Sequence, residues 1–190
     1  MSKVIFFMST SLDGYIEGPN REIDWHHVDD EFNEVAIRQL TEADTLLFGR
    51  VTYELMAGFW PTKEAIETDP IVAGLMNSKS KIVFSKSLIK ADWQNTRLVK
   101  TDFITELNRL KKKPGEGLFM LGGSDLAVSC LQAGLLDEIR IMLNPIVLGA
   151  GKPLFKGIQN RLNLKLLKTR VFKNGNVLLS YRPVYQTEGA

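Results

Sequence analysis

The sequence has very few residues that bind metals or form disulfides. Cys130 is the only cysteine, so the chain can build neither an internal disulfide nor a multi-cysteine zinc site. The two histidines, His26 and His27, are adjacent. Adjacent side chains point to opposite faces of a strand and lie about 100° apart on a helix, which makes them a poor metal pair. We therefore expect no metal cofactor.

Long apolar runs and an excess of one charge are also missing. No apolar run approaches the roughly 20 residues that a membrane-spanning helix needs, and the apolar segment after Lys3 is too short for a signal peptide. The net charge is +2, from 24 basic and 22 acidic residues, which argues against nucleic-acid binding through bulk charge. We expect a cytoplasmic protein with neither a membrane nor a nucleic-acid partner.

The chain does contain enough apolar material for one core. Its 190 residues are 44% hydrophobic, and we expect one domain over residues 1–185 with a tail at 186–190. Buried-strand patterns alternate with amphipathic helices, and Asn174-Gly175 marks a closing hairpin. This order predicts a three-layer α/β fold: a mostly parallel central sheet, helices on both faces and a C-terminal antiparallel hairpin. The expected strands span residues 4–8, 45–48, 81–84, 118–121, 139–143, 165–172 and 177–184.

The expected helices begin near residues 30, 52, 70, 103 and 124. Short polar side chains that satisfy free backbone N–H groups mark these starts. The expected N-caps are Asp29 or Asp30, Thr52, Asp69 followed by Pro70, and Asp102. Gly134 is expected to end the helix that begins at Ser124.

Four loops that follow expected strands are rich in glycine, hydroxyl and basic side chains. They span residues 9–14, 49–52, 85–87 and 122–124. In open α/β sheets, ligands bind outside the carboxyl ends of the strands. The four loops are therefore the candidate site.

These loops suit a phosphorylated ligand. Thr52 and Ser124 each open a helix, and helix N-termini bind anions through free N–H groups and the macrodipole. The Gly122-Gly123 pair lacks Cβ atoms, so a pyrophosphate can approach its backbone closely. Arg50 and Lys86 follow strands and can reach a phosphate monoester. Two helix starts with two cations favour a dinucleotide that carries an extra phosphate. We therefore expect NADPH rather than NADH as the ligand. The alternative is a set of ordinary capped turns.

Other sites are weaker candidates. The chain has no P-loop motif, no zinc-deaminase signature and no G-x-S-x-G motif. Gly149 and Gly151 form only a G-x-G, and no helix pattern follows them. Residues 111–113 are three lysines at a helix end, where cations favour the dipole. Cys130 lies on an apolar helix face and is expected in the core.

At these positions the sequence resembles the RibD C-terminal domain group, which shares the dihydrofolate reductase fold. The matching segments follow the family's order and span nearly the whole chain. They are residues 11–16 (SLDGYI), 48–54 (FGRVTYE), 83–85 (VFS), 121–124 (LGGS) and 145–155 (PIVLGAGKPLF). The chain is most similar to small stand-alone bacterial members.

The resemblance implies NADPH as cofactor. It places the mobile loop with Asp13 and Gly14 beside the nicotinamide. It also places the Gly122-Gly123 pair at the pyrophosphate, where the corresponding peptide bond of dihydrofolate reductases is cis. By the same resemblance, Gly49, Arg50 and Thr52 form a helix start that binds phosphate. Ser85 and Lys86 match the loop that contacts the adenosine 2′-phosphate.

One acidic residue is the expected catalytic group. In dihydrofolate reductases a carboxylate at the start of the first helix holds the pterin; Trp25 matches the tryptophan before it, and five residues on is Asp30. In a partly dry pocket this carboxyl group would hydrogen-bond an amino-pyrimidine edge and deliver a proton. Asp30 is alternatively an N-cap, and Asp29 and Glu31 compete for either role. Trp25, Phe32 and Trp60 line the pocket or pack in the core.

We therefore expect an NADPH-dependent reductase of a small heterocyclic substrate. By family resemblance the first substrate is 5-amino-6-(5-phosphoribosylamino)uracil, an intermediate of riboflavin biosynthesis, although we identify no residue set that grips a ribose phosphate. The alternatives are a dihydrofolate or pteridine reductase and a non-catalytic nucleotide-binding module. The family tendency and the exposed edge of the terminal hairpin predict a homodimer.

Overall fold

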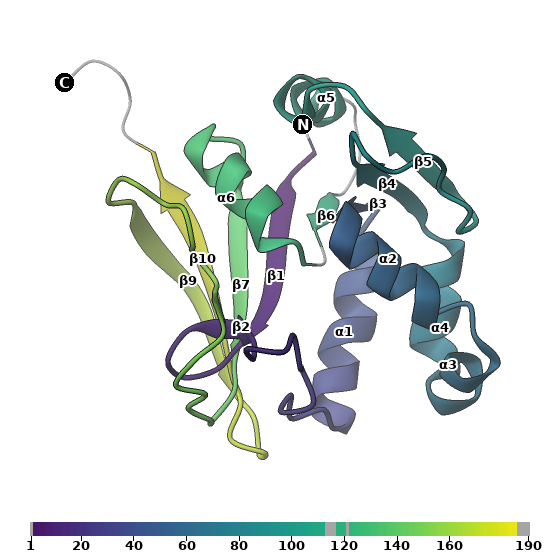
Figure 1. Ribbon diagram of the computed structural model, residues 1–190. Helices are drawn as coiled ribbons and strands as arrows, with labels where there is room; N and C mark the ends of the chain where they lie inside the picture. Colours follow the sequence, from purple (N-terminus) through teal and green to yellow (C-terminus); the bar gives the residue numbers. More distant parts are fainter. Residues whose placement is uncertain (1, 113–116, 121, 186–190) are drawn as a thin grey trace.

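The computed structural model describes residues 2–112, 117–120 and 122–185; the expected tail at 186–190 lies outside them. Strands and helices alternate along most of the chain (Figure 1). The strands are β1 (Val4–Thr10), β2 (Tyr15–Glu17), β3 (Thr45–Gly49), β4 (Ser80–Phe84), β5 (Thr96–Val99), β6 (Leu118–Met120), β7 (Glu138–Leu143), β8 (Lys152–Pro153), β9 (Asn163–Val171) and β10 (Val177–Val184). The helices are α1 (Asp30–Glu42), α2 (Arg50–Phe59), α3 (Lys63–Thr68), α4 (Pro70–Ser78), α5 (Phe103–Lys111) and α6 (Ser124–Gln132).

Eight strands form one sheet in the order β5-β4-β3-β6-β1-β7-β10-β9. The pairings from β5 through β7 are parallel, and β10 joins β7 and β9 in antiparallel fashion. The predicted mostly parallel sheet with a closing hairpin is therefore confirmed. A two-stranded ribbon of β2 and β8, which the sequence patterns do not predict, links two loops at one end of the sheet.

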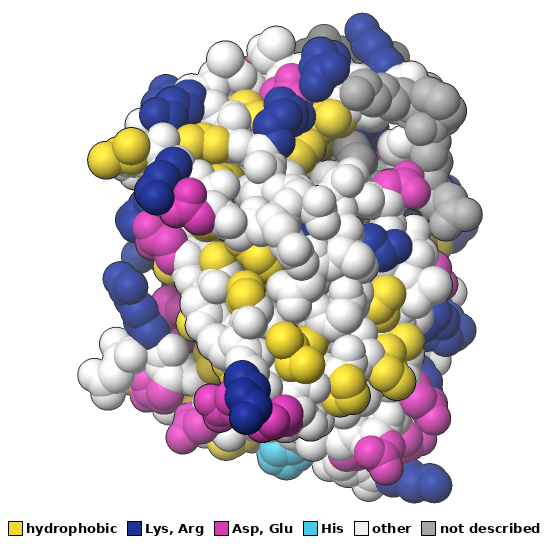
Figure 2. All heavy atoms as spheres, turned by 90° about the vertical axis from the view of Figure 1, so that its right-hand side faces the viewer, with side chains coloured by type: hydrophobic (Ala, Val, Ile, Leu, Met, Phe, Trp, Pro, Cys, Tyr) yellow, Lys and Arg dark blue, Asp and Glu magenta, His cyan; other side chains and the backbone are white. Residues whose placement is uncertain are grey.

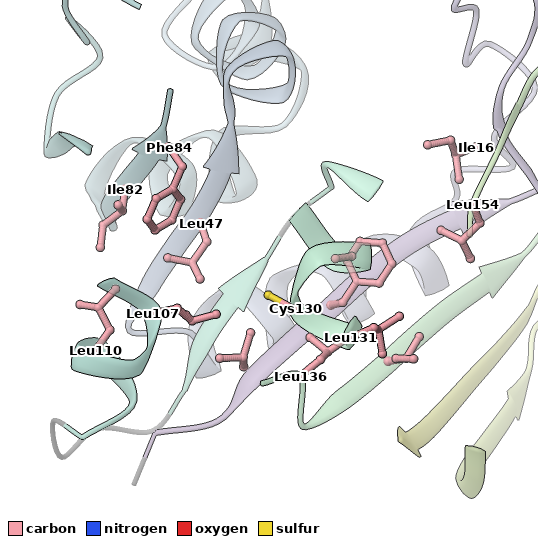
Figure 3. Packing of buried hydrophobic residues seen from close by; sticks show 14 of the residues in the cluster. Ile16, Leu47, Ile82, Phe84, Leu107, Leu110, Cys130, Leu131, Leu136 and Leu154 are labelled. Carbon is pink, nitrogen blue, oxygen red and sulfur yellow. The ribbon is translucent and has the colours of Figure 1, made fainter. Parts of the chain in front are cut away.

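Helices cover both faces of this sheet, as predicted. On one face, α1, α2 and α4 pack through Leu40, Tyr53 and Met76 against Phe48 and Val83 of the strands. On the other face, α5 and α6 cover alternate strand residues (Figure 3). The members labelled there include Leu47 and Phe84 from the strands, Leu107 and Leu110 from α5, and Cys130 and Leu131 from α6. Cys130 is buried in this cluster, and burial raises the pKa of its thiol to about 12.

The local capping predictions are mostly confirmed. Asp29, Asp69 and Asp102 each accept a hydrogen bond from a backbone N–H of the first turn that follows. Asp29, not Asp30, is thus the cap of α1. The prediction for Thr52 is wrong: α2 begins at Arg50, its N-cap is Gly49, and it runs on to Phe59. Glycine leaves the N-terminal amides of α2 without a side-chain cap.

The two outermost strands of the sheet, β5 and β9, differ. Strand β5 is a short parallel edge that the sequence patterns miss because its four residues, TRLV, show no clear alternation. Strand β9 is a long edge, and eight of its nine residues are exposed. The hairpin turn before β10 contains Gly175 with a φ of +92°, a conformation that favours glycine.

Candidate functional site

The four candidate loops lie along the edge of the sheet that the carboxyl ends of its parallel strands form. Strands β4, β3, β6 and β1 are neighbours and run parallel, so their carboxyl ends form a row. Gly49 at the end of β3 pairs with Phe84 at the end of β4, so Arg50 and Ser85 leave the sheet from adjacent strands. The structure thus brings together segments that are far apart in the sequence.

The centre of this edge is a tight contact between α2 and the glycine pair before α6. A Cβ atom added to Gly122 would lie 3.1 Å from Thr52 Cγ2, and one added to Gly123 would lie 3.7 Å from the Gly49 backbone nitrogen. Both glycines have positive φ angles, +113° and +79°. Two helix N-termini therefore converge where the backbone is bare, a geometry suited to an anion.

Ser124 adds a hydroxyl group to this centre. It is the first residue of α6 and is 2% exposed. Its Oγ atom is buried and has no hydrogen-bond partner among the residues that the structure describes. A buried hydroxyl without a partner is costly, and this one lies in the first turn of α6, at the helix N-terminus where an anion would bind.

One implied feature is absent from the described residues, which contain no cis peptide bond. The expectation of a cis bond between Gly122 and Gly123 is wrong for this structure. The chain turns here through the positive φ angles of the two glycines and enters α6 from a left-handed N-cap at Gly123.

The two expected cations lie at the outer part of the edge. Arg50 is half-exposed, and its Nη1 atom donates to Glu54 Oε2 at 2.8 Å, one helical turn along α2. Lys86 is exposed. The pKa of Asp102 at the start of α5 is lowered, first by the hydrogen bond from the Thr105 backbone N–H and to a smaller extent by the Lys86 charge. The Ser85 Oγ atom accepts from the backbone nitrogen of Leu88 at 2.9 Å, which shapes this loop.

The loop after β1 is held by the chain itself. The Asp13 carboxylate accepts from Ser11 Oγ at 2.6 Å and from the backbone nitrogens of Leu148 at 3.1 Å and Gly149 at 2.8 Å. The hydrogen bond from Ser11 is the main cause of the lowered pKa of Asp13. Gly14, with a φ of +84°, accepts through its carbonyl oxygen from the backbone nitrogen of Leu154. Asp13 and Gly14 thus fasten loop 11–14 to segment 145–154.

The expected acid lies at the start of α1. Asp30 is exposed, directly after the capping residue Asp29. The segment before it reaches the same sheet edge, because the His27 backbone nitrogen donates to Asn144 Oδ1 at 2.9 Å just beyond β7. The role of Asp30 as proton donor stays a prediction.

The three aromatic residues near this region have different surroundings. Trp25 is 8% exposed and donates through Nε1 to the Glu22 carbonyl oxygen. Phe32 packs on Phe7 of β1, with ring centroids 6.5 Å apart. Trp60 belongs to the hydrophobic cluster of α2 and α4.

Sequence reasoning missed a buried polar cluster at this edge. Asn144 is 1% exposed, and its Nδ2 atom donates to the carbonyl oxygens of Thr10 and Met142. Asn176, fully buried, donates through Nδ2 to the His27 carbonyl oxygen at 2.8 Å. These amides join β1, β7, the final hairpin and the segment before α1. The signal available was an asparagine directly after a buried strand.

The described residues contain no group of three histidine, cysteine, aspartate or glutamate side chains placed to hold a metal ion. None of the helices in the described part of the chain is long and apolar enough to cross a membrane. On the face in Figure 2, basic and acidic side chains are interspersed around hydrophobic ones.

The architecture and the glycine-lined edge define an α/β fold of the dihydrofolate reductase kind. The chain belongs to the RibD C-terminal domain family, whose model matches residues 2–178. It is 36% identical over 179 residues to the uncharacterized protein YyaP of Bacillus subtilis (strain 168), with 94% of each chain covered.

Solved structures agree with this assignment. A protein of Shewanella sp. PV-4 named for riboflavin biosynthesis matches with a TM-score of 0.75 and 26% identity, over 96% of this chain and 99% of that one. The diaminohydroxyphosphoribosylaminopyrimidine deaminase/5-amino-6-(5-phosphoribosylamino)uracil reductase of Thermotoga maritima matches at 0.69 and 16%, over 96% and 57%. The dihydrofolate reductase of Enterococcus faecalis, complexed with NADP(H), matches at 0.61 and 14%, over 95% and 96%. The last two show the fold alone.

Proposed function

We propose that this protein is a cytoplasmic NADPH-dependent reductase of a small heterocyclic substrate. The observation that carries the proposal is the bare backbone at Gly122 and Gly123, against the uncapped N-terminus of α2. The family and the names of the matched structures support an oxidoreductase of this kind.

The residues present fit a dinucleotide. The Gly122-Gly123 pair and the α6 N-terminus would hold the pyrophosphate, and the buried Ser124 hydroxyl would gain the partner that it lacks among the described residues. Arg50 and Lys86 would meet the 2′-phosphate. When bound, NADPH supplies the hydride.

The substrate would lie between this edge and the start of α1. Asp30 would hydrogen-bond the amino-pyrimidine edge and deliver the proton that a reduced C=N or C=O group needs. Loop 11–14, fastened through Asp13 to segment 145–154, would help to exclude water. The first substrate to test is 5-amino-6-(5-phosphoribosylamino)uracil, and the second is dihydrofolate or another pteridine.

Binding and chemistry are tested separately. Titration with NADPH, followed by tryptophan emission, should give a saturable signal, and its absence up to millimolar cofactor would refute the proposal. Asp30→Asn should lower turnover by roughly 10²- to 10⁴-fold while the NADPH Kd stays the same. Asp24→Asn, a change at a nearby exposed carboxylate, is the control and should leave both unchanged.

A second candidate is a nucleotide-binding module without catalysis. The exposure of Asp30 favours it, because an exposed carboxylate in the first turn of a helix is common without any catalytic role. If NADPH binds but no pyrimidine or pterin stimulates its oxidation, this candidate replaces the reductase.

A further inference from the structure

The candidate phosphate-binding cation Arg50 already has an anionic partner. Its Nη1 atom lies 2.8 Å from Glu54 Oε2, one helical turn along α2. The two side chains are 46% and 47% exposed, so solvent reaches both. A phosphate that approaches Arg50 therefore meets a cation whose charge a carboxylate partly neutralises.

The pair lies where the 2′-phosphate would be recognised. Arg50 follows β3 and Ser85 follows the adjacent strand β4. A Cβ atom added to Gly123 would lie 3.7 Å from the backbone nitrogen of Gly49, the residue before Arg50. The atoms nearest to the Cβ positions of Gly122 and Gly123 do not include any atom of Glu54. The carboxylate can thus affect the 2′-phosphate through Arg50 without changing the pyrophosphate contacts.

Glu54 also has room to leave Arg50. It lines a hollow of about 720 Å³ formed by α2, α3 and the chain around Trp93. The same hollow is lined by Lys90, which is ion-paired to Asp92. A Glu54 carboxylate displaced from Arg50 would therefore face water and the Lys90–Asp92 ion pair. Because the Arg50–Glu54 pair is itself half-exposed, its separation costs little.

We propose that Glu54 sets the preference for NADPH over NADH by competing with the 2′-phosphate for Arg50. This inference rests on the proposed function, because it assumes that the edge binds the dinucleotide. NADH has no 2′-phosphate, so its binding does not require that Arg50 leave Glu54. The Arg50–Glu54 pair thus weakens the binding of NADPH but not the binding of NADH. It thereby reduces the preference of the protein for NADPH.

The test is Glu54→Gln, which keeps the shape of the side chain and removes its charge. At low salt, the NADPH Kd should fall roughly two- to fivefold, the range expected from an exposed ion pair, and the NADH Kd should not change. The gain should shrink at high salt, because exposed charges are screened. In an Arg50→Gln background the Glu54 change should have no effect, since the competing cation is gone.

Glu67→Gln is the matched control. Glu67 forms the same i,i+4 pair with Lys63 on α3 at 3.5 Å, so this variant removes one charge from another exposed helix pair. It should leave both Kd values unchanged. An equal gain in the control would reduce the effect to general electrostatics and overturn the proposal.

The outcomes separate this inference from the proposed function. If the wild type binds NADPH but Glu54→Gln leaves the NADPH to NADH ratio unchanged, the inference fails and the proposed function stands. Weaker NADPH binding would mean that Glu54 orients Arg50, which also overturns the competition. If the wild type binds neither dinucleotide, both proposals fail.

Discussion

Replacing Lys81 with methionine is expected to change how the stability of this protein depends on pH. Lys81 begins the buried part of β4 and is 1% exposed. Its Nζ atom donates to the carbonyl oxygens of Met76 at 2.8 Å, Asn77 at 3.1 Å and Lys79 at 2.7 Å, at the end of α4. It also lies 4.5 Å from the ring centroid of Trp93. The side chain is thus an ammonium group enclosed by protein.

Burial lowers the pKa of Lys81 from 10.5 to about 8. Between these two pH values the unfolded chain binds a proton that the folded chain does not, so the free energy of unfolding rises with pH. At about 1.4 kcal/mol per pH unit, the rise amounts to at most about 3 kcal/mol between pH 8 and 10.5. It is lost as the pH falls through 8. The three carbonyl groups and Trp93 favour the ammonium, which makes this value an upper limit.

The assay is urea unfolding of the wild type and Lys81→Met from pH 7 to 10.5, followed by tryptophan emission. Subtraction of the two curves matters, because burial raises the pKa values of Cys130 and Tyr185 to about 12, and these groups lower stability as the pH rises. Their effect is common to both proteins and cancels. Parallel curves for the two proteins across this range would refute the reasoning.

Two further predictions concern the Gly122-Gly123 pair and the exposed edge strand β9. Gly122→Ala should destabilise the protein by about 1–3 kcal/mol and weaken NADPH binding, because the new Cβ would meet Thr52 and the φ of +113° disfavours a side chain. Gly58→Ala, in α2 with open space around it, is the control, and it should raise the Tm; equal effects of the two changes would contradict the argument. We also propose a homodimer through β9, whose edge exposes Leu167 and its neighbours. Light scattering should give twice the monomer mass of 21.4 kDa, and Leu167→Glu should lower it towards one copy; a wild type that is monomeric at micromolar concentration would refute the dimer.

Much of the fold could be predicted because its signals are local. An aspartate that caps a helix bonds a backbone N–H three residues away, so Asp69 and Asp102 mark helix starts in the sequence itself. Parallel strands that are buried on both faces appear in the sequence as short, continuous apolar runs, which is also a local signal. The start of α2 was misplaced because Gly49 caps through backbone geometry, which leaves no side-chain signal.

The candidate site was only partly predictable. The glycine pair, the α6 start and Arg50 were found because loops after parallel strands meet at one sheet edge. The partners of those residues were not found. Asp13 bonds amides 135 and 136 residues away, and Asn144 reaches Thr10 over 134 residues. No periodicity or spacing specifies such pairs.

The sequence alone determined the alternation of strands and helices, the closing hairpin and the bare backbone at residues 122–123. The tertiary structure alone decided that Lys81 is buried against α4, that Asp13 holds a distant loop and that Asp30 is exposed. The physical reason is range. Dihedral preferences and caps act within a few residues, whereas burial and electrostatic environment depend on which distant segments fold against a side chain.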